Sequence, residues 1–231
     1  MNGAIAHRGP DAEGLWMRGK GVLGHRRLSI VDLRPAANQP LLNEDESIGL
    51  VVNGEIYNHL SIREELVDKG HVFRSDSDSE VILHGYEEWS ENITDKLTCM
   101  FAFAIWDSKR ERLFVARDRA GKKPLFYRRF PDGSVAFASE VHALVRGFPH
   151  APITPDLGAI DEYLTLQYVP SPRTVYREIR KLEAAHHAVF EKDRDPRIVS
   201  YWQKPAGPTL DGDEEELARE LQSLLKRAVE R

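Results

Sequence analysis

Short apolar segments separated by turn residues dominate the chain between residues 21 and 138. They run over residues 21–25, 48–53, 100–107, 113–117, 125–129 and 135–138, and turn sequences such as Pro131-Asp132-Gly133 lie between them. Segments of this length that are rich in β-branched and aromatic residues are typical of strands. Because the turns between consecutive strands are short, the sequence predicts mainly antiparallel pairing.

Helical patterns run over residues 61–69, 77–89, 156–167 and 213–231. The first two begin with Ser61 and Ser77, each followed three residues later by Glu, which is the pattern of a capping box. The other two begin with Asp156 and Asp213, which are favourable N-cap residues. Since strands and helices are grouped and do not alternate strictly, the predicted fold class is α+β.

The C-terminal part of the chain differs from the rest in composition. Residues 204–212 contain two prolines and two glycines and are interpreted as a linker, which divides the chain into residues 1–203 and 204–231. The last predicted helix carries a one-sided apolar stripe, which requires a covering surface. The stripe consists of Leu217, Leu221, Leu224, Leu225 and Val229.

Composition limits the class of protein. With 231 residues, of which 41% are hydrophobic, the chain can bury one substantial core. It has no apolar run long enough to span a bilayer, so we expect no membrane binding. Its net charge is -5 and its Lys and Arg residues form no basic stripe, so we expect no nucleic-acid binding. Its single cysteine, Cys99, excludes an intramolecular disulfide and a cysteine-based metal site, which favours a cytoplasmic location.

The segment from Val51 to Asn58 carries the clearest candidate chemistry. Two valines end an apolar strand, and Asn53 and Gly54 follow where we expect a polar turn. A side-chain amide and a backbone N–H at a strand end could form an oxyanion hole, in which each donor is worth about 3 kcal/mol. Asn-Gly is also a common hairpin signal, so the segment alone favours an ordinary turn.

Further motifs along the chain change that interpretation. Together they closely resemble the glutaminase domain of glutamine-hydrolysing asparagine synthetases, which are class II glutamine amidotransferases. The resemblance covers the chain from about His7 to Trp202. The motifs are His7-Arg8-Gly9-Pro10-Asp11, Arg27-Leu28-Ser29-Ile30-Val31-Asp32, Asn53-Gly54-Glu55-Ile56-Tyr57-Asn58, Ser77-Asp78-Ser79-Glu80-Val81-Ile82-Leu83 and Arg117-Asp118-Arg119-Ala120-Gly121-Lys122-Lys123-Pro124-Leu125.

The resemblance implies a four-layer αββα sandwich of the N-terminal-nucleophile hydrolase type. Enzymes of that family use an N-terminal cysteine as nucleophile, whereas this sequence starts with Met1-Asn2-Gly3, so the first strand-helix unit of the family is missing from it. Neither Met1 nor Asn2 can replace the thiolate. We interpret Cys99, which lies in an apolar run, as a buried packing residue and not as the nucleophile.

The resemblance also implies which residues would hold glutamine. Arg27 matches the family's carboxylate-binding arginine, Asp78 its ammonium-binding aspartate, and Asn53 with Gly54 its oxyanion hole. Glu55 and the backbone of Leu28, Ser29, Ile30 and Val31 would line the pocket. Without the resemblance, Arg27 could equally be a solvent-exposed charge beside Arg26. Asp78 could equally be an acidic residue at the start of a helix, where the helix dipole favours a negative charge.

Two other polar motifs are interpreted as structural. A lone histidine is more often a hydrogen-bonded structural residue than a base or metal ligand, which we apply to His7. Arg117, Asp118 and Arg119 are predicted to form a local ion-pair network that organises the loop to Pro124.

We therefore expect the glutaminase portion of an asparagine synthetase, with L-glutamine as ligand. The parent reaction would release ammonia from glutamine and transfer it to AMP-activated aspartate. We expect this chain to bind glutamine without turning it over, and to contain no cofactor or metal; ATP and Mg are expected only in the synthetase domain. Alternatives are a non-catalytic glutamine-binding or scaffold module, and an amidotransferase domain that serves another acceptor. The last predicted helix, at 213–231, is expected to pack its apolar stripe on the synthetase domain or on a partner, or to support a homodimer.

Overall fold

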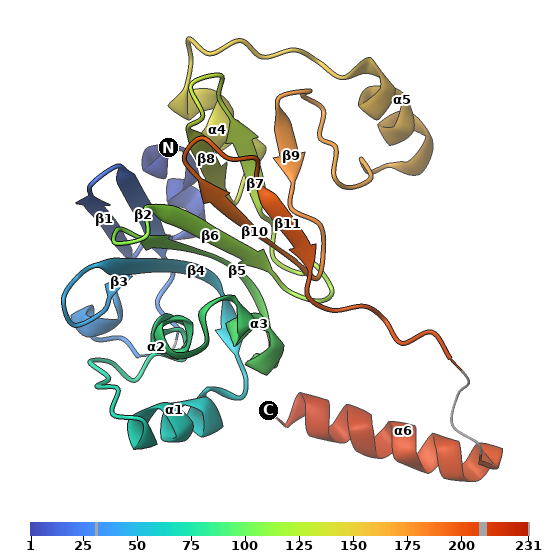
Figure 1. Ribbon diagram of the computed structural model, residues 1–231. Helices are drawn as coiled ribbons and strands as arrows, with labels where there is room; N and C mark the ends of the chain where they lie inside the picture. Colours follow the sequence, from blue (N-terminus) through green and yellow to red (C-terminus); the bar gives the residue numbers. More distant parts are fainter. Residues whose placement is uncertain (31, 208–211, 231) are drawn as a thin grey trace.

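The computed structural model describes residues 1–30, 32–207 and 212–230 (Figure 1). Within these ranges the strands form a six-stranded sheet of order β11-β10-β6-β5-β4-β3, a three-stranded sheet of order β8-β7-β9 and a β1-β2 ribbon, all with antiparallel pairing. The strands are β1 Ala12–Arg18, β2 Gly21–Arg27, β3 Leu41–Leu42, β4 Ile48–Ile56, β5 Cys99–Asp107, β6 Arg112–Arg117, β7 Phe126–Arg129, β8 Val135–Ala138, β9 Ile179–Lys181, β10 His186–Glu191 and β11 Arg197–Ser200.

Helices lie on the outer faces of the two larger sheets, as Figure 1 shows. Helices α1 to α3 cover the six-stranded sheet, and α4 with the 3-10 segment η1 packs against the three-stranded sheet. The predicted four-layer αββα order is therefore confirmed. The helical bounds are η1 Asn2–Arg8, η2 Pro35–Ala37, α1 His59–Asp68, α2 Glu80–Trp89, η3 Ser90–Asn92, α3 Ile93–Lys96, α4 Val141–Gly147, α5 Leu157–Leu166 and α6 Glu214–Val229.

The two longest strands, β4 and β5, are buried on both faces. In β4, Leu50 and Val52 join the core under helices α1 and α2, whereas Val51 joins the core between the sheets. In β5, Phe103 faces the helices and Ala104 faces the second sheet. Alternate side chains of a strand point to opposite faces, so two-sided burial requires the nearly continuous apolar runs that mark these strands in the sequence.

The six strands expected from the sequence are all present, with bounds that differ by at most three residues. The structure adds β1, β3, β9, β10 and β11, which the sequence did not predict. Strand β1 escaped prediction because one of its faces is exposed and carries Leu15 and Met17, so it lacks a clear alternation of apolar and polar residues. Strands β3 and β9 are only two and three residues long, too short for a recognisable period.

The expected turn at Asn53 and Gly54 was wrong. Strand β4 continues through Ile56, and Asn53 and Gly54 pair with Ala102 and Phe101 of β5. A Cβ atom on Gly54 would lie 2.4 Å from the Met100 carbonyl oxygen. Glycine is therefore present because the backbones of β4 and β5 approach closely at this point, and not because a turn requires it.

Both predicted capping boxes were also wrong. Helix α1 begins two residues before Ser61, whose hydroxyl donates to the Asn58 carbonyl at 3.0 Å. Helix α2 begins at Glu80, whose carboxylate accepts from the backbone N–H of Arg74 at 2.7 Å and from that of Ser75 at 2.8 Å. In α2 the glutamate therefore ties the incoming loop to the helix, which replaces the reciprocal bond to Ser77 that the capping box requires.

The caps of the last two helices are confirmed. The Asp156 carboxylate accepts from the N–H groups of Gly158 and Ala159, and that of Asp213 accepts from Glu216 at 2.8 Å. The apolar stripe of α6 is largely exposed. Part of the predicted linker, at 208–211, and Arg231 lie outside the described residues. Among the described residues no helix is long and apolar enough to cross a membrane.

Candidate functional site

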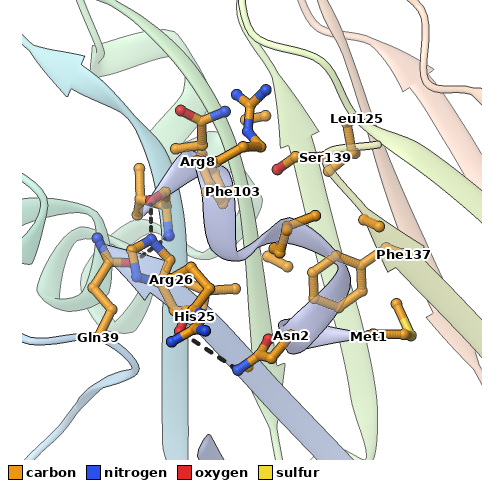
Figure 2. A pocket seen from close by; sticks show the side chains of 18 of the residues that line it. Met1, Asn2, Arg8, His25, Arg26, Gln39, Phe103, Leu125, Phe137 and Ser139 are labelled. Atoms are coloured by element: carbon orange, nitrogen blue, oxygen red, sulfur yellow. Dashed lines mark hydrogen bonds between the residues drawn. The ribbon is translucent and has the colours of Figure 1, made fainter. Parts of the chain in front are cut away.

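A cleft of about 980 Å³ lies between the two larger sheets and the β1-β2 ribbon. One wall comes from β4 and β5, and the opposite wall includes β8. In Figure 2, Gln39 and His25 lie on one side of the cleft, and Phe137, Leu125 and Ser139 lie on the other. Because strands from both sheets contribute, a ligand here would contact residues that are distant in the sequence.

The cleft brings together most of the residues predicted to hold glutamine. Those that line it are Arg27, Leu28, Ile30, Asn53, Gly54, Glu55 and Asp78. Ser29 does not line it, and its backbone N–H donates to the Asp11 carboxylate at 2.7 Å. Val31 lies outside the described residues.

Asn53 contributes the clearest unsatisfied polar group. Its side-chain nitrogen Nδ2 is buried and has no hydrogen-bond partner in the described part of the chain. A buried donor without an acceptor costs about 1–3 kcal/mol, so the folded state retains a penalty that a ligand oxygen could remove. Asn53 lies within β4, which pairs with β5, so the backbone that carries this amide is held in place.

Two side chains from outside β4 fix the strand next to Asn53. His25 Nε2 lies 3.0 Å from the Val52 carbonyl oxygen, and Gln39 Oε1 accepts from the Val52 N–H at 2.5 Å. Burial, with the nearby Arg27 charge, lowers the pKa of His25 to about 4, although the bond to Val52 acts in the opposite direction. His25 is therefore neutral at pH 7 and donates one N–H to β4.

The sequence interpretation missed His25 and Gln39. For His25 a signal was available, because residues 23, 25 and 27 share one face of β2 and Leu23 and Arg27 on that face are buried. Gln39 lies in a connection between η2 and β3, where no local pattern indicates the side-chain direction.

Arg27 is buried, with 7% of its surface exposed, so the alternative of a solvated charge is wrong. Its guanidinium donates to Asn38 Oδ1 at 2.8 Å and to the carbonyl oxygens of Asp32 at 2.5 Å and Arg34 at 3.4 Å. The side chain thus holds the loop after β2 against the cleft. A guanidinium fixed in this way presents its charge at a defined position.

Asp78 is also 7% exposed, and it precedes α2. Its carboxylate accepts from the backbone N–H of Ile56 at 2.7 Å and from the Ser79 hydroxyl at 3.3 Å. The carboxylate is therefore directed to the end of β4, although Asp78 also lies directly before the N-cap residue of α2. Two buried charges of opposite sign consequently line one cleft.

Cys99 does not line the cleft. It is the first residue of β5, half-buried against the core under the helices. Burial, together with Asp118, raises the pKa of its thiol well above the ordinary range. A thiol in such surroundings is protonated at neutral pH and is a poor nucleophile, as the packing interpretation predicts.

The motif from Arg117 to Pro124 organises its loop, though by a different interaction from the one predicted. The Asp118 carboxylate accepts from the N–H groups of Ala120, Lys122 and Lys123, each at 3.0 Å. Arg117 donates to the carbonyl oxygens of Gly121 and Lys123. No ion pair within 4.0 Å joins Arg117, Asp118 and Arg119 in the described structure, so the backbone provides the partners.

His7 has a structural partner, as expected. Its Nε2 lies 3.0 Å from Glu140 Oε1, and Arg8 donates to the same carboxylate oxygen at 3.1 Å. These contacts join η1 to the residue that precedes α4.

Comparison with known proteins identifies the family. The family model described as "Glutamine amidotransferase domain" matches residues 1–202. The chain belongs to the glutamine amidotransferase domain family. A solved structure with a similar fold is glutamine phosphoribosylpyrophosphate amidotransferase from B. subtilis, with a TM-score of 0.56 and 21% identity over 81% of this chain and 36% of that one. This likeness confirms the N-terminal-nucleophile hydrolase type of fold.

The curated relatives of this glutamine amidotransferase domain are longer proteins. "Asparagine synthetase [glutamine-hydrolyzing] 1" of Bacillus subtilis is 38% identical over 229 residues, which is 99% of this chain and 35% of that protein. "Asparagine synthetase [glutamine-hydrolyzing] 3" of Arabidopsis thaliana is 49% identical over 140 residues, 61% of this chain and 24% of that protein. The domain thus spans about a third of the length of the first of these relatives.

Proposed function

We propose that this chain binds L-glutamine in the cleft between the sheets, as the glutaminase part of an asparagine synthetase. The observation that carries the proposal is the buried Asn53 carboxamide nitrogen, which has no hydrogen-bond partner among the described residues, in a cleft that Arg27 and Asp78 also line. The family match and the names of the longer relatives support the same ligand.

The chemistry of free glutamine fits this set of groups. Arg27 would bind the α-carboxylate, for which a guanidinium offers paired donors. Asp78 would bind the α-ammonium group. The Asn53 amide and the Gly54 N–H would bind the carboxamide oxygen, where negative charge develops during acyl transfer. Because Arg27 already fixes the loop after β2, carboxylate binding would be coupled to the position of that loop.

In the whole protein, we propose that ammonia from glutamine is passed to AMP-activated aspartate in a synthetase domain that holds ATP and Mg. The exposed apolar stripe of α6 would pack on that domain. A cytoplasmic location suits the single free thiol. A domain serving another amide acceptor would have the same cleft, since the cleft recognises the donor of ammonia.

The position of Cys99 limits the chemistry that this polypeptide can carry out on bound glutamine. The only thiol of the 231-residue polypeptide, Cys99, lies away from the cleft and has a raised pKa. We therefore expect this polypeptide to release no ammonia from glutamine above the uncatalysed rate. Release that is lost in Cys99→Ala would overturn this expectation and the packing role of Cys99.

Calorimetric titration with L-glutamine tests the binding site. We expect saturable binding to the wild-type chain. Asp78→Asn should weaken it at least about tenfold, since a charge-assisted hydrogen bond is worth about 1.5–3 kcal/mol, and Asn53→Ala should weaken it by about two- to tenfold, since a neutral hydrogen bond is worth about 0.5–1.5 kcal/mol. The control His150→Gln changes an exposed residue outside the cleft and should bind as the wild type does. Equal binding by all four proteins, or none by the wild type, would contradict the proposal.

A further inference from the structure

Four potential metal-binding side chains meet on the helical side of the six-stranded sheet, away from the cleft. Glu44 lies between β3 and β4, His71 follows α1, and His84 and Glu87 lie one turn apart on α2. Each offers one nitrogen or oxygen atom, and these atoms all lie within 4.8 Å of one another. None of the four residues lines the glutamine cleft.

Glu87 lies next to both histidines of the group. Its Oε2 is 2.9 Å from His84 Nδ1 and 3.8 Å from His71 Nδ1, and His84 Nδ1 is 3.9 Å from Glu44 Oε1. A tetrahedral ion bound at about 2.0–2.2 Å holds its ligand atoms roughly 3.4 Å apart. The observed separations bracket that value, so side-chain shifts of less than about 1 Å would complete the coordination.

The outer nitrogens of both imidazoles face further carboxylates. His84 Nε2 lies 3.6 Å from Glu80 Oε1, and His71 Nε2 lies 3.7 Å from Glu88 Oε2. The second oxygen of Glu87 accepts from Asn43 Nδ2 at 2.8 Å. Carboxylates behind metal-ligating histidines, and hydrogen bonds behind ligating carboxylates, are the usual outer contacts that orient metal ligands.

A bound proton is the competing explanation for the cluster. Burial alone would lower the pKa of His84, but the side chains of Glu80 and Glu87 outweigh it and raise the pKa to about 9. A proton on His84 would let both of its ring nitrogens interact with the carboxylates of Glu80 and Glu87, so it explains the surroundings of that residue. It leaves His71 unexplained, because the His71 ring makes no hydrogen bond within 3.5 Å to any described residue and only lies tilted against the His84 ring, with the centroids 5.2 Å apart.

We propose that Glu44, His71, His84 and Glu87 form a binding site for one divalent transition-metal ion of the Zn²⁺ type. Two imidazole nitrogens with two carboxylate oxygens suit Zn²⁺, whereas Mg²⁺ and Ca²⁺ take oxygen ligands. The half-exposed Glu44 gives an ion access, and the buried His84 anchors it to α2. The ion would join the β3-β4 loop and the segment after α1 to α2, and so stabilise the helical layer.

The test uses the chain without an affinity tag, treated with a chelator and then titrated with Zn²⁺ by calorimetry. We expect one saturable site, a rise in the melting temperature with added Zn²⁺, and the visible absorption of tetrahedral Co²⁺ when Co²⁺ replaces Zn²⁺. Excess Mg²⁺ should not displace either ion. The glutamine site does not enter this experiment, so its result is independent of the proposed function.

Variants assign the ligands. His84 is buried and its replacement can prevent folding, so the informative changes are Glu44→Gln and His71→Asn, which alter more accessible residues. Each should weaken Zn²⁺ binding at least about tenfold and change the Co²⁺ spectrum, whereas the exposed control His150→Asn should alter neither. Absence of saturable Zn²⁺ binding by the wild type, or wild-type affinity in both variants, would overturn the proposal.

Discussion

Single residues of the cleft have structural as well as predicted binding roles. Arg27 fixes the loop after β2, Asp78 binds the end of β4, and His25 binds the carbonyl of Val52. Each side chain therefore stabilises the strand or loop that positions the cleft. Substitutions at these positions combine an effect on binding with an effect on stability, and the two must be measured separately.

The buried neutral His25 predicts a pH dependence of stability. Its pKa in the folded chain is about 4, below the ordinary value of 6.5, so between these pH values the unfolded chain binds a proton that the folded chain does not. The free energy of unfolding therefore falls as pH decreases through about 6.5 and continues to fall to about 4. This contribution is fully retained only above pH 6.5.

Denaturant unfolding of the wild type and of His25→Gln, followed by tryptophan fluorescence, measures this effect. The stability advantage of the wild type over the variant should shrink by about 2 kcal/mol between pH 8 and pH 5, at about 1.4 kcal/mol per pKa unit. The advantage over His150→Gln, whose histidine is exposed, should change little. An advantage over His25→Gln that is constant with pH would show that folding does not lower the pKa of His25.

At the scale of elements, the close approach of the β4 and β5 backbones determines which residue can occupy position 54 in the cleft. Gly54 pairs with Phe101, and a Cβ atom at Gly54 would lie 2.9 Å from the Phe101 Cα as well as 2.4 Å from the Met100 carbonyl oxygen. Both are backbone atoms of a central strand, so a side chain can be accommodated only if the strands separate.

Gly54→Ala should therefore destabilise the chain by roughly 1–3 kcal/mol, the usual cost of overpacking a core. The matched control is Gly207→Ala, because a Cβ at Gly207 meets no atom within 4 Å. Melting temperatures measured by calorimetry distinguish the two. If Gly54→Ala melts at the same temperature as the control, β4 and β5 can separate at this point without cost.

At the scale of the whole molecule, α6 presents an apolar surface that nothing described covers. Leu221 is 57% exposed, Leu225 is 58% exposed and Val229 is 86% exposed. A one-sided stripe on a helix is normally buried against a partner surface. We therefore expect this polypeptide to self-associate in a concentration-dependent manner through α6.

Sedimentation velocity over a range of concentrations tests this expectation. The double variant Leu221→Glu with Leu225→Glu should remain monomeric at concentrations where the wild type associates. A control, Val67→Ser, changes a residue of similar exposure on α1 and should associate as the wild type does. A wild-type monomer at every concentration would show that the stripe of α6 is not self-complementary.

The sequence by itself determined the strands β4, β5 and β6, which are buried on both faces, the caps at Asp156 and Asp213, and the family. Those features are local: a continuous apolar run, an acid before a helix, or a motif of adjacent residues is read directly from the chain. It also predicted several residues that line the cleft, among them Arg27, Asn53 and Asp78, because the resemblance carried information about residues that are distant in sequence.

Only the tertiary structure decided how those residues are held. The Asn53-Gly54 pair has the local pattern of a turn, but pairing with β5 over nine residues keeps it in a strand. Arg27 acquires its partners from a loop, and His71 meets His84 only because α1 and α2 pack together. Contacts between segments distant in sequence depend on how the layers pack, and no local pattern encodes them.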